Sequence, residues 1–237
     1  GAGFGGWRWG AGGAGQRGIG REGPRAGPRR GLGGCGRWGG GLAGPWPGRM
    51  FADLGAEFIK IEPRGGGDDT RHWGPPYLKD KAGNDTADAA YFFCTNRSKQ
   101  SVTVDITRPE GQEIIRQLAL RCDVLIENYK VGGLKKYGLD YASIAEINPR
   151  LIYCSISGYG QTGPDTARPA FAPIINAASG FTMGEFRYQR GREKPERSRN
   201  LSADALGATH ALIAIMAALR QRETTGLGDH LDVELLA

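Results

Sequence analysis

Apolar and polar positions follow two different periods along the chain from Leu42 onward. Strand-like runs, alternating or mostly apolar, occur at 57–62, 101–106, 123–127 and 151–157. The segment between 108 and 120 has instead the spacing of an amphipathic helix, with Pro109 in its first turn. Strands that alternate with helices pair in parallel. The pattern therefore predicts an α/β fold with a Rossmann-like, doubly wound, mostly parallel sheet.

A long helix is predicted over about 202–222, and the strand-like run HLDVELL follows it. The apolar face of this helix is expected to contain Leu206, Ile213, Met216, Ala217 and Leu219. In doubly wound sheets, ligands bind beyond the carboxyl ends of the strands. We therefore expect the loops after residues 62, 127 and 156 to form the functional edge.

Composition separates the first 49 residues from the rest. They hold 21 of the 40 glycines and eight arginines against one glutamate. Few of these side chains can bury area, so residues 1–41 are expected to form a disordered, low-complexity leader. Arginines and glycines with interspersed tryptophans suit single-stranded nucleic acid. Shared G- and C-rich codons and a first methionine at Met50 favour instead an over-extended translation, so no nucleic-acid partner is expected.

The cysteines give no metal signature. None of the four forms a CxxC pair or has zinc-like spacing to a histidine. Reduced thiols in a cytoplasmic chain are the simplest interpretation, with Cys122 and Cys154 buried beside strands. No apolar run reaches the ~20 residues of a membrane-spanning helix. Neither a metal nor a membrane association is expected.

Three glycine-containing loops follow predicted strands. The run RGGGDD lacks the spacing of dinucleotide and phosphate-binding loops, so a turn is the simplest interpretation, and Asp68 and Asp69 alone make a weak cation site. The segment ENYKVGGLKKYG, 127–138, suits an anionic nucleotide or is a turn with solvated lysines. The segment SGYGQTGP places Tyr159 at a strand end, where its side chain either contacts a ligand or packs.

Four long segments, in this order, resemble the family III CoA-transferases. This group includes the formyl-CoA:oxalate, carnitine and bile-acid CoA-transferases and the related α-methylacyl-CoA racemases. The segments are LAGPWPGRMFADLGAEFIKIEPRGGGDDTRHWGPP, NRSKQSVTVDITRPEG, DVLIENYKVGGLKKYGLDYASIAEINPRLIYCSISGYGQTGP and ALIAIMAALRQRETTGLGDHLDVELL. The resemblance implies coenzyme A or an acyl-CoA and a carboxylic acid as substrates. It also implies aspartyl anhydride and aspartyl-CoA intermediates, in which a carboxylate is the nucleophile.

The resemblance further implies site residues. The family's CoA contacts fall on Val104, Thr107, Asn128, Tyr129, Lys136, Tyr137 and Tyr159. Tyr159 also matches an active-site tyrosine. The position of the catalytic aspartate holds Arg187, and Glu185 is the nearest acid. In the racemase alternative, the catalytic aspartate matches Asp204, but Phe171 stands at the histidine position.

Three parts are expected along the chain. Residues 1–41 are the leader, 42–200 a Rossmann-like CoA-binding large domain, and 201–237 a long helix and strand that lead toward a small domain, most of which is lacking. Family members form interlocked homodimers, and a chain ending at Ala237 could not close such a ring. The expected function is CoA transfer between an acyl-CoA and a carboxylic acid. Racemisation of an α-methylacyl-CoA, or CoA binding without catalysis, is the alternative.

Overall fold

The structure is a computed structural model of the 237-residue chain, and it describes residues 34–36, 41–196 and 200–236. Contacts divide the chain into two units, residues 1–30 and 31–237. The first unit and most of the expected leader lie outside the described residues, and of 34–36 only the backbone is described.

Strands and helices alternate along the second unit. The strands are β1 Gly34–Gly36, β2 Phe58–Glu62, β3 Tyr77–Lys79, β4 Asp85–Ala89, β5 Gln100–Thr103, β6 Val124–Glu127, β7 Ile152–Ser157 and β8 His230–Glu234. The α-helices are α1 Pro45–Asp53, α2 Ala90–Asn96, α3 Pro109–Ala119, α4 Tyr141–Ile147, α5 Ala172–Ala178, α6 Phe181–Arg187 and α7 Ser202–Thr225. Two 3-10 helices, η1 Asp69–His72 and η2 Lys135–Tyr137, complete the set. The β3–β4 hairpin, α2, α5 and α6 had no counterpart in the sequence prediction.

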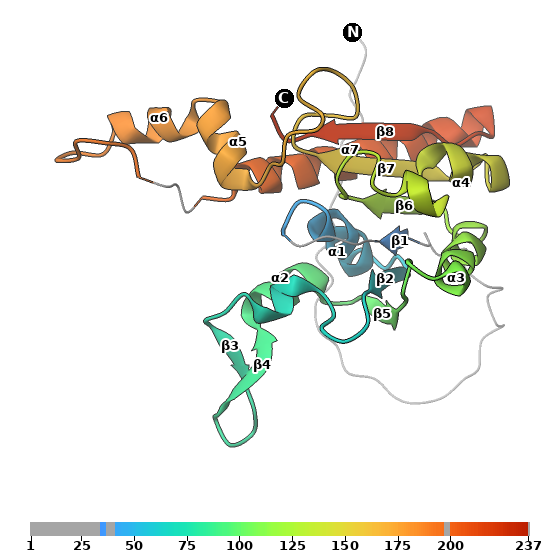
Figure 1. Ribbon diagram of the computed structural model, residues 1–237, viewed down its shortest axis with the longest axis horizontal. Helices are drawn as coiled ribbons and strands as arrows, with labels where there is room; N and C mark the ends of the chain where they lie inside the picture. Colours follow the sequence, from blue (N-terminus) through green and yellow to red (C-terminus); the bar gives the residue numbers. More distant parts are fainter. Residues whose placement is uncertain (1–33, 37–40, 197–199, 237) are drawn as a thin grey trace, which may run out of the picture. The chain divides into compact units, whose positions relative to one another are not determined.

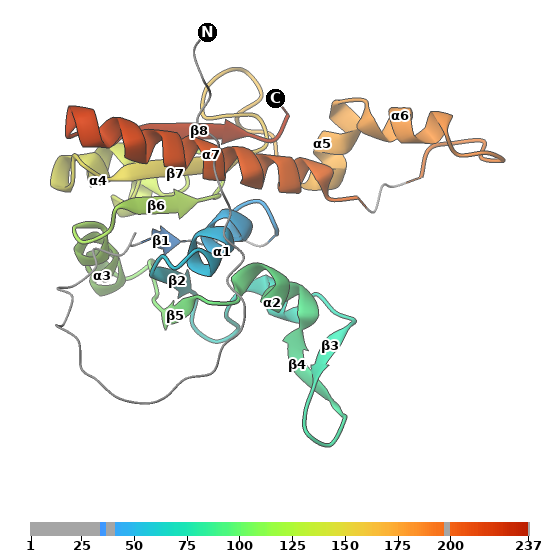
Figure 2. The same cartoon turned by 180° about the vertical axis from the view of Figure 1, so that it is seen from behind.

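Six strands form one sheet in the order β5-β2-β1-β6-β7-β8, and every neighbouring pair is parallel. Helices α1 and α7 cover one face of this sheet, and α3 and α4 cover the other (Figures 1 and 2). The predicted Rossmann-like, doubly wound α/β fold is therefore confirmed.

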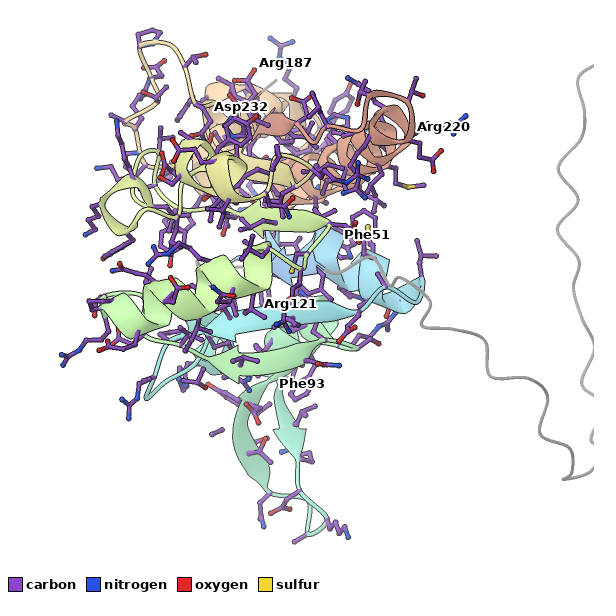
Figure 3. All side chains as sticks on the ribbon, turned by 90° about the vertical axis from the view of Figure 1, so that its right-hand side faces the viewer. Phe51, Phe93, Arg121, Arg187, Arg220 and Asp232 are labelled. Carbon is purple, nitrogen blue, oxygen red and sulfur yellow. The ribbon has the colours of Figure 1, made fainter. Side chains whose placement is uncertain are left out.

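Each face of the sheet has its own apolar core, because successive strand residues point to opposite faces. Ile126 and Ile152 pack with Phe51 and Ile215 on the side of α1 and α7. Leu125 and Tyr153 belong to the second cluster, with residues of α3 and α4. Phe51, labelled in Figure 3, is one of the helix side chains of the first cluster.

The central strand begins before the expected start of the fold. β1 pairs with β2 on one side and with β6 on the other, through the same three residues. The sequence analysis placed the first structured residue at Leu42 and assigned Gly34–Gly36 to the leader. The structure corrects this boundary for these three residues: a glycine-rich segment has no apolar pattern, yet its backbone completes the hydrogen-bonded ladder.

Helix α7 faces the sheet with its small residues. Its buried side is formed by Ala203, Gly207, Ala208, Ala211, Ile215 and Ala218, together with Asp204. The predicted apolar face was wrong for Leu206, Ile213 and Met216, which are 60, 59 and 55% exposed, and for Ala217, which is exposed as well. Small side chains allow the helix to approach the sheet closely, so size rather than hydrophobicity determined the orientation.

By length and composition alone, α7 would also be able to cross a membrane. The sequence analysis expected no such segment. A helix that packs on a sheet inside a folded domain passes the same test, so this single match is weak support for a membrane span.

The glycine run after β2 is a structural turn held by buried charges. Lys60, which is 2% exposed, donates to Asp68 at 2.5 Å and to Asn96 at 2.9 Å. Arg71 binds both carboxylate oxygens of Glu62 at 3.0 Å. A side chain on Gly67, whose φ is +67°, would lie 2.7 Å from a Glu62 oxygen. Gly67 is therefore packed against these ion pairs, whereas side chains on Gly65 and Gly66 would meet nothing within 4 Å, as expected of a turn.

Removal of the Lys60 ammonium should destabilise the fold strongly, because it leaves the buried Asp68 carboxylate without this cation. We expect Lys60→Met to lower the free energy of unfolding by about 3–5 kcal/mol in urea denaturation. The matched control is Lys79→Met, which breaks a pair with Asp85 whose side chains are 58 and 56% exposed. This control should lose less than about 1 kcal/mol. Similar losses for both variants would contradict this assignment.

Candidate functional site

The direction of winding reverses between β1 and β6. From β1 the chain moves to β2 and β5 on one side, and it then returns to place β6 on the other side of β1. At such a switch point the loops beyond the carboxyl ends of the two strands diverge and leave a crevice. The loops after β1 and β6 still approach each other at one point. A side chain on Gly44 would lie 2.9 Å from the Asn128 side chain.

A cavity of about 370 Å³ lies at this switch point. Its walls come from the loops after β1, β6 and β7, with further contributions from the start of α7 and from Leu235. The lining residues are Gly41–Ala43, Asn128–Val131, Ile156–Gly158, Thr166–Phe171, Asp204 and Leu235. Three loops that are far apart in the sequence therefore meet at one carboxyl edge, as the order of the strands requires.

Asp204 is the carboxylate among the residues that line this cavity. It lies in the first turn of α7, is 9% exposed, and accepts a hydrogen bond from the Leu42 backbone N–H at 3.4 Å. Burial raises the pKa of the Asp204 carboxyl, and the Leu42 N–H only partly opposes this effect. A desolvated carboxylate next to a cavity is a candidate for nucleophilic or acid–base chemistry.

Two hydroxyl-bearing side chains accompany this carboxylate, one on the same cavity wall and one within its electrostatic influence. The Ser157 hydroxyl oxygen is buried and has no hydrogen-bond partner among the described residues, and Ser157 lines the cavity. Burial raises the pKa of the Tyr91 phenol, and the charge of Asp204 raises it further. The Tyr91 phenol therefore stays protonated. Either hydroxyl can act as a donor, and neither was anticipated from the sequence.

A second cavity, of about 310 Å³, shares the wall Tyr129–Val131 with the first. It lies between the loop after β6, the start of α4, and strands β7 and β8. His230 stacks on Tyr141, with ring centroids 4.4 Å apart, and its Nε2 lies 3.0 Å from the Ser155 hydroxyl oxygen. Burial lowers the pKa of His230, although the nearby Asp232 acts in the opposite direction.

Comparisons with known proteins agree with this architecture. The sequence profile of CoA-transferase family III matches residues 37–237. A succinate–glutarate CoA-transferase from Agrobacterium fabrum is 45% identical over 193 residues, which are 81% of this chain and 47% of that protein. The human succinyl-CoA:glutarate CoA-transferase is 43% identical over 187 residues, or 78% of this chain and 40% of that protein. A CAIB/BAIF family protein from Brucella suis has a crystal structure that matches with a TM-score of 0.77 and 43% identity, covering 87% of this chain and 52% of that chain.

This chain belongs to CoA-transferase family III. The resemblance deduced from the sequence motifs is thereby confirmed. The family III chain spans about half the length of the relatives that it matches.

The family-implied CoA contacts fall into two groups. Asn128 and Tyr129 line the first cavity, and Tyr129 also lines the second. Val104 is instead buried in the core beneath α3. The Thr107 hydroxyl donates to Asp105 just before that helix, at 2.6 Å. CoA contact by these residues stays a prediction.

Lys136 and Tyr137 lie in the 3-10 helix η2. The Lys136 ammonium lies 4.7 Å from the centre of the Tyr137 ring, and neither residue lines either of the two cavities described above. The sequence analysis missed Lys130, which lines both cavities. Its place directly after the ENY segment was the available signal, because a loop that leaves a strand at the switch point faces the crevice.

The three catalytic candidates also differ in position. Asp204 lines the cavity, whereas Glu185 lies on α6, which contributes no lining residue. Tyr159 packs behind the wall in a small apolar cluster with Ala172, Ile175 and Ala203. The loop after β2, expected at the functional edge, lines neither cavity.

No group of three or more potential metal-ligating side chains occurs in the part of the chain that the structure describes.

Asp204→Asn should stabilise the fold at neutral pH. The raised pKa means that the folded state favours the protonated carboxyl. Protonation of Asp204 therefore stabilises the fold fully at pH values below the pKa of the unfolded state, 3.8. This stabilisation is lost as the pH rises through the higher pKa of the folded state. An amide is neutral at all these pH values, so the melting temperature should rise by about 2–4 °C at pH 7. The gain should disappear near pH 3.

Thermal denaturation across this pH range checks the prediction. The matched control is Glu57→Gln, which removes an exposed carboxylate and should shift the melting temperature little at either pH. A lower melting temperature of Asp204→Asn at pH 7 would contradict the conclusion that burial of the charged Asp204 carboxylate destabilises the fold.

Proposed function

We propose that this family III chain takes part in CoA transfer between an acyl-CoA and a carboxylic acid, with Asp204 as the reacting carboxylate. The observation that carries the proposal is the position of Asp204: it is the acid that lines the switch-point cavity. The family and the names of its relatives support the reaction class. The two relatives named for succinate and glutarate support small dicarboxylic acids as substrates.

The proposed reaction has balanced steps. The Asp204 carboxylate attacks the thioester carbonyl carbon and the C–S bond breaks. CoA departs as a thiolate, and a mixed anhydride between Asp204 and the acyl group remains. The thiolate then attacks the aspartyl carbonyl carbon, which releases the first acid and forms an aspartyl-CoA thioester. The second acid repeats both steps in the opposite order and departs as the new acyl-CoA. No net proton or electron transfer is needed.

Several residues of the chain can assist these steps. A carboxylate is a weak nucleophile, and removal of water from it increases its reactivity once it is ionised. The Ser157 hydroxyl, a donor with no described partner, supports stabilisation of a developing oxyanion. The shared wall of the two cavities, with Asn128, Tyr129 and Lys130, would bind CoA.

Proton exchange at the α-carbon of an acyl-CoA is the second candidate. The raised pKa of Asp204 favours it, because a buried carboxyl of this kind can transfer protons near neutral pH. Phe171 lines the same cavity at the position where a second proton carrier is expected, and its side chain cannot titrate. Incorporation of solvent deuterium into a 2-methylacyl-CoA would identify this activity.

The location of the protein and its assembly into dimers are proposed on separate grounds. Cys94 and Cys154 are free thiols, and Cys122 and Cys154 are buried as predicted; the free thiols support a reducing, cytoplasmic compartment. Homodimer formation is proposed for the full-length protein, on the basis of the family alone.

A covalent adduct tests the role of Asp204. Incubation with an acyl-CoA should increase the intact mass of the protein by CoA minus one water, located to the Asp204 peptide by mass spectrometry. Asp204→Asn should abolish this adduct, because an amide is not a comparable nucleophile. Glu185→Gln, which changes an acid outside the cavity, should retain it. An adduct that survives in Asp204→Asn and is lost in Glu185→Gln would transfer the role to Glu185.

Charge reversal tests the proposed CoA surface. We expect Lys130→Glu to weaken CoA binding by about tenfold or more at low salt, because Lys130 lines both cavities and CoA phosphates are anionic. Lys136→Glu should have a smaller effect. Isothermal titration calorimetry at two salt concentrations gives both values. A larger loss for Lys136→Glu would place the phosphates over η2 instead.

A further inference from the structure

The cavity that holds Asp204 also has cationic groups on its wall. Among its described lining residues, Lys130 and Arg168 are basic and Asp204 is acidic. In the proposed reaction an acyl group or an acid must place one carboxyl carbon at Asp204. A dicarboxylic acid has a second carboxylate, which needs a partner elsewhere on the wall.

Two contacts orient Arg168 on this wall. Its Nη1 donates to Asp165 at 3.1 Å, and its guanidinium carbon lies 5.2 Å from the centre of the Tyr159 ring. Tyr159 in turn packs with Ala203, the residue before Asp204. One buried aromatic side chain therefore stands between the guanidinium and the start of α7.

The contacts of Arg168 leave part of its guanidinium available. The Asp165 pair uses Nη1, and the side chains of the pair are 61 and 49% exposed, so this ion pair is weak and open to competition. The Nε and Nη2 donors make no hydrogen bond with the described residues. A planar guanidinium edge binds a carboxylate through two parallel hydrogen bonds, whereas the flexible ammonium of Lys130 is a point charge shared by both cavities.

We propose that Arg168 binds the distal carboxylate of a dicarboxylic substrate while the other carboxyl group reacts at Asp204. This inference rests on the proposed CoA transfer and adds a residue that determines the choice of acid. Tyr159 then has a positioning role: it supports the guanidinium from behind the wall. The exposure of the Arg168 side chain leaves its guanidinium open to a carboxylate that arrives from solvent.

Length-matched acids test the proposal. The chain is assayed with acetyl-CoA as donor and with glutarate or valerate as acceptor, which have five carbons and differ by one carboxylate. We expect Arg168→Gln to lower kcat/KM for glutarate roughly tenfold or more and to leave valerate within about twofold. Arg168→Lys should be intermediate for glutarate. The matched control is Arg121→Gln, an exposed arginine beyond the end of α3 that lines neither cavity (Figure 3).

The outcomes separate this inference from the proposed function. An equal fall for both acids, or unchanged glutarate kinetics, overturns the role of Arg168 while CoA transfer stands. Failure of the unmodified chain to transfer CoA to either acid overturns the proposed function. In that case the role of Arg168 is decided by NMR titration with glutarate and valerate. Weaker binding of glutarate alone in Arg168→Gln supports it, and equal binding to both proteins, or no glutarate binding, overturns it.

Discussion

Continuity of the sheet through β1 is the constraint on which the rest of the structure depends. Three residues join β2 and β5 on one side to β6, β7 and β8 on the other. The reversal of winding at this strand brings the loops after β1 and β6 together, and glycine at position 44 permits their contact. The cavity, its carboxylate and its shared wall all follow from the position of one short strand.

Asp204 shows how stability and chemistry oppose each other at this point. Its carboxyl is buried in the first turn of a long helix and receives one long backbone hydrogen bond from Leu42. Packing of small α7 residues on the sheet brings the carboxyl to the cavity wall, where burial disfavours its charge. The fold tolerates this unfavourable charge because the rest of the helix contributes apolar burial. The same desolvation makes the group chemically useful.

The sequence predicted those features that side-chain pattern determines. The runs at 57–62 and 123–127 were recognised as strands, since apolar side chains on a parallel sheet repeat in a simple way. β1 was missed because backbone pairing by glycine has no such pattern. Helix α7 was found, but its orientation was not. Its large apolar residues and its alanines are both hydrophobic, and only the close approach to the sheet distinguishes them.

For the site, the resemblance identified the segment that contains Asn128 and Tyr129 and missed Lys130 and Arg168. Which of several adjacent polar residues faces a cavity depends on loop conformation, and no periodicity describes it. Asp204 was given a catalytic role only through the racemase alternative, and its burial could not be read from neighbours that are mostly small.

The common wall of the two cavities means that their linings are not independent. Tyr129, Lys130 and Val131 belong to one short stretch of backbone, and each of them borders both spaces. A substitution at any one of these three residues therefore changes two surfaces at once, so a variant made to alter one space also alters the lining of its neighbour.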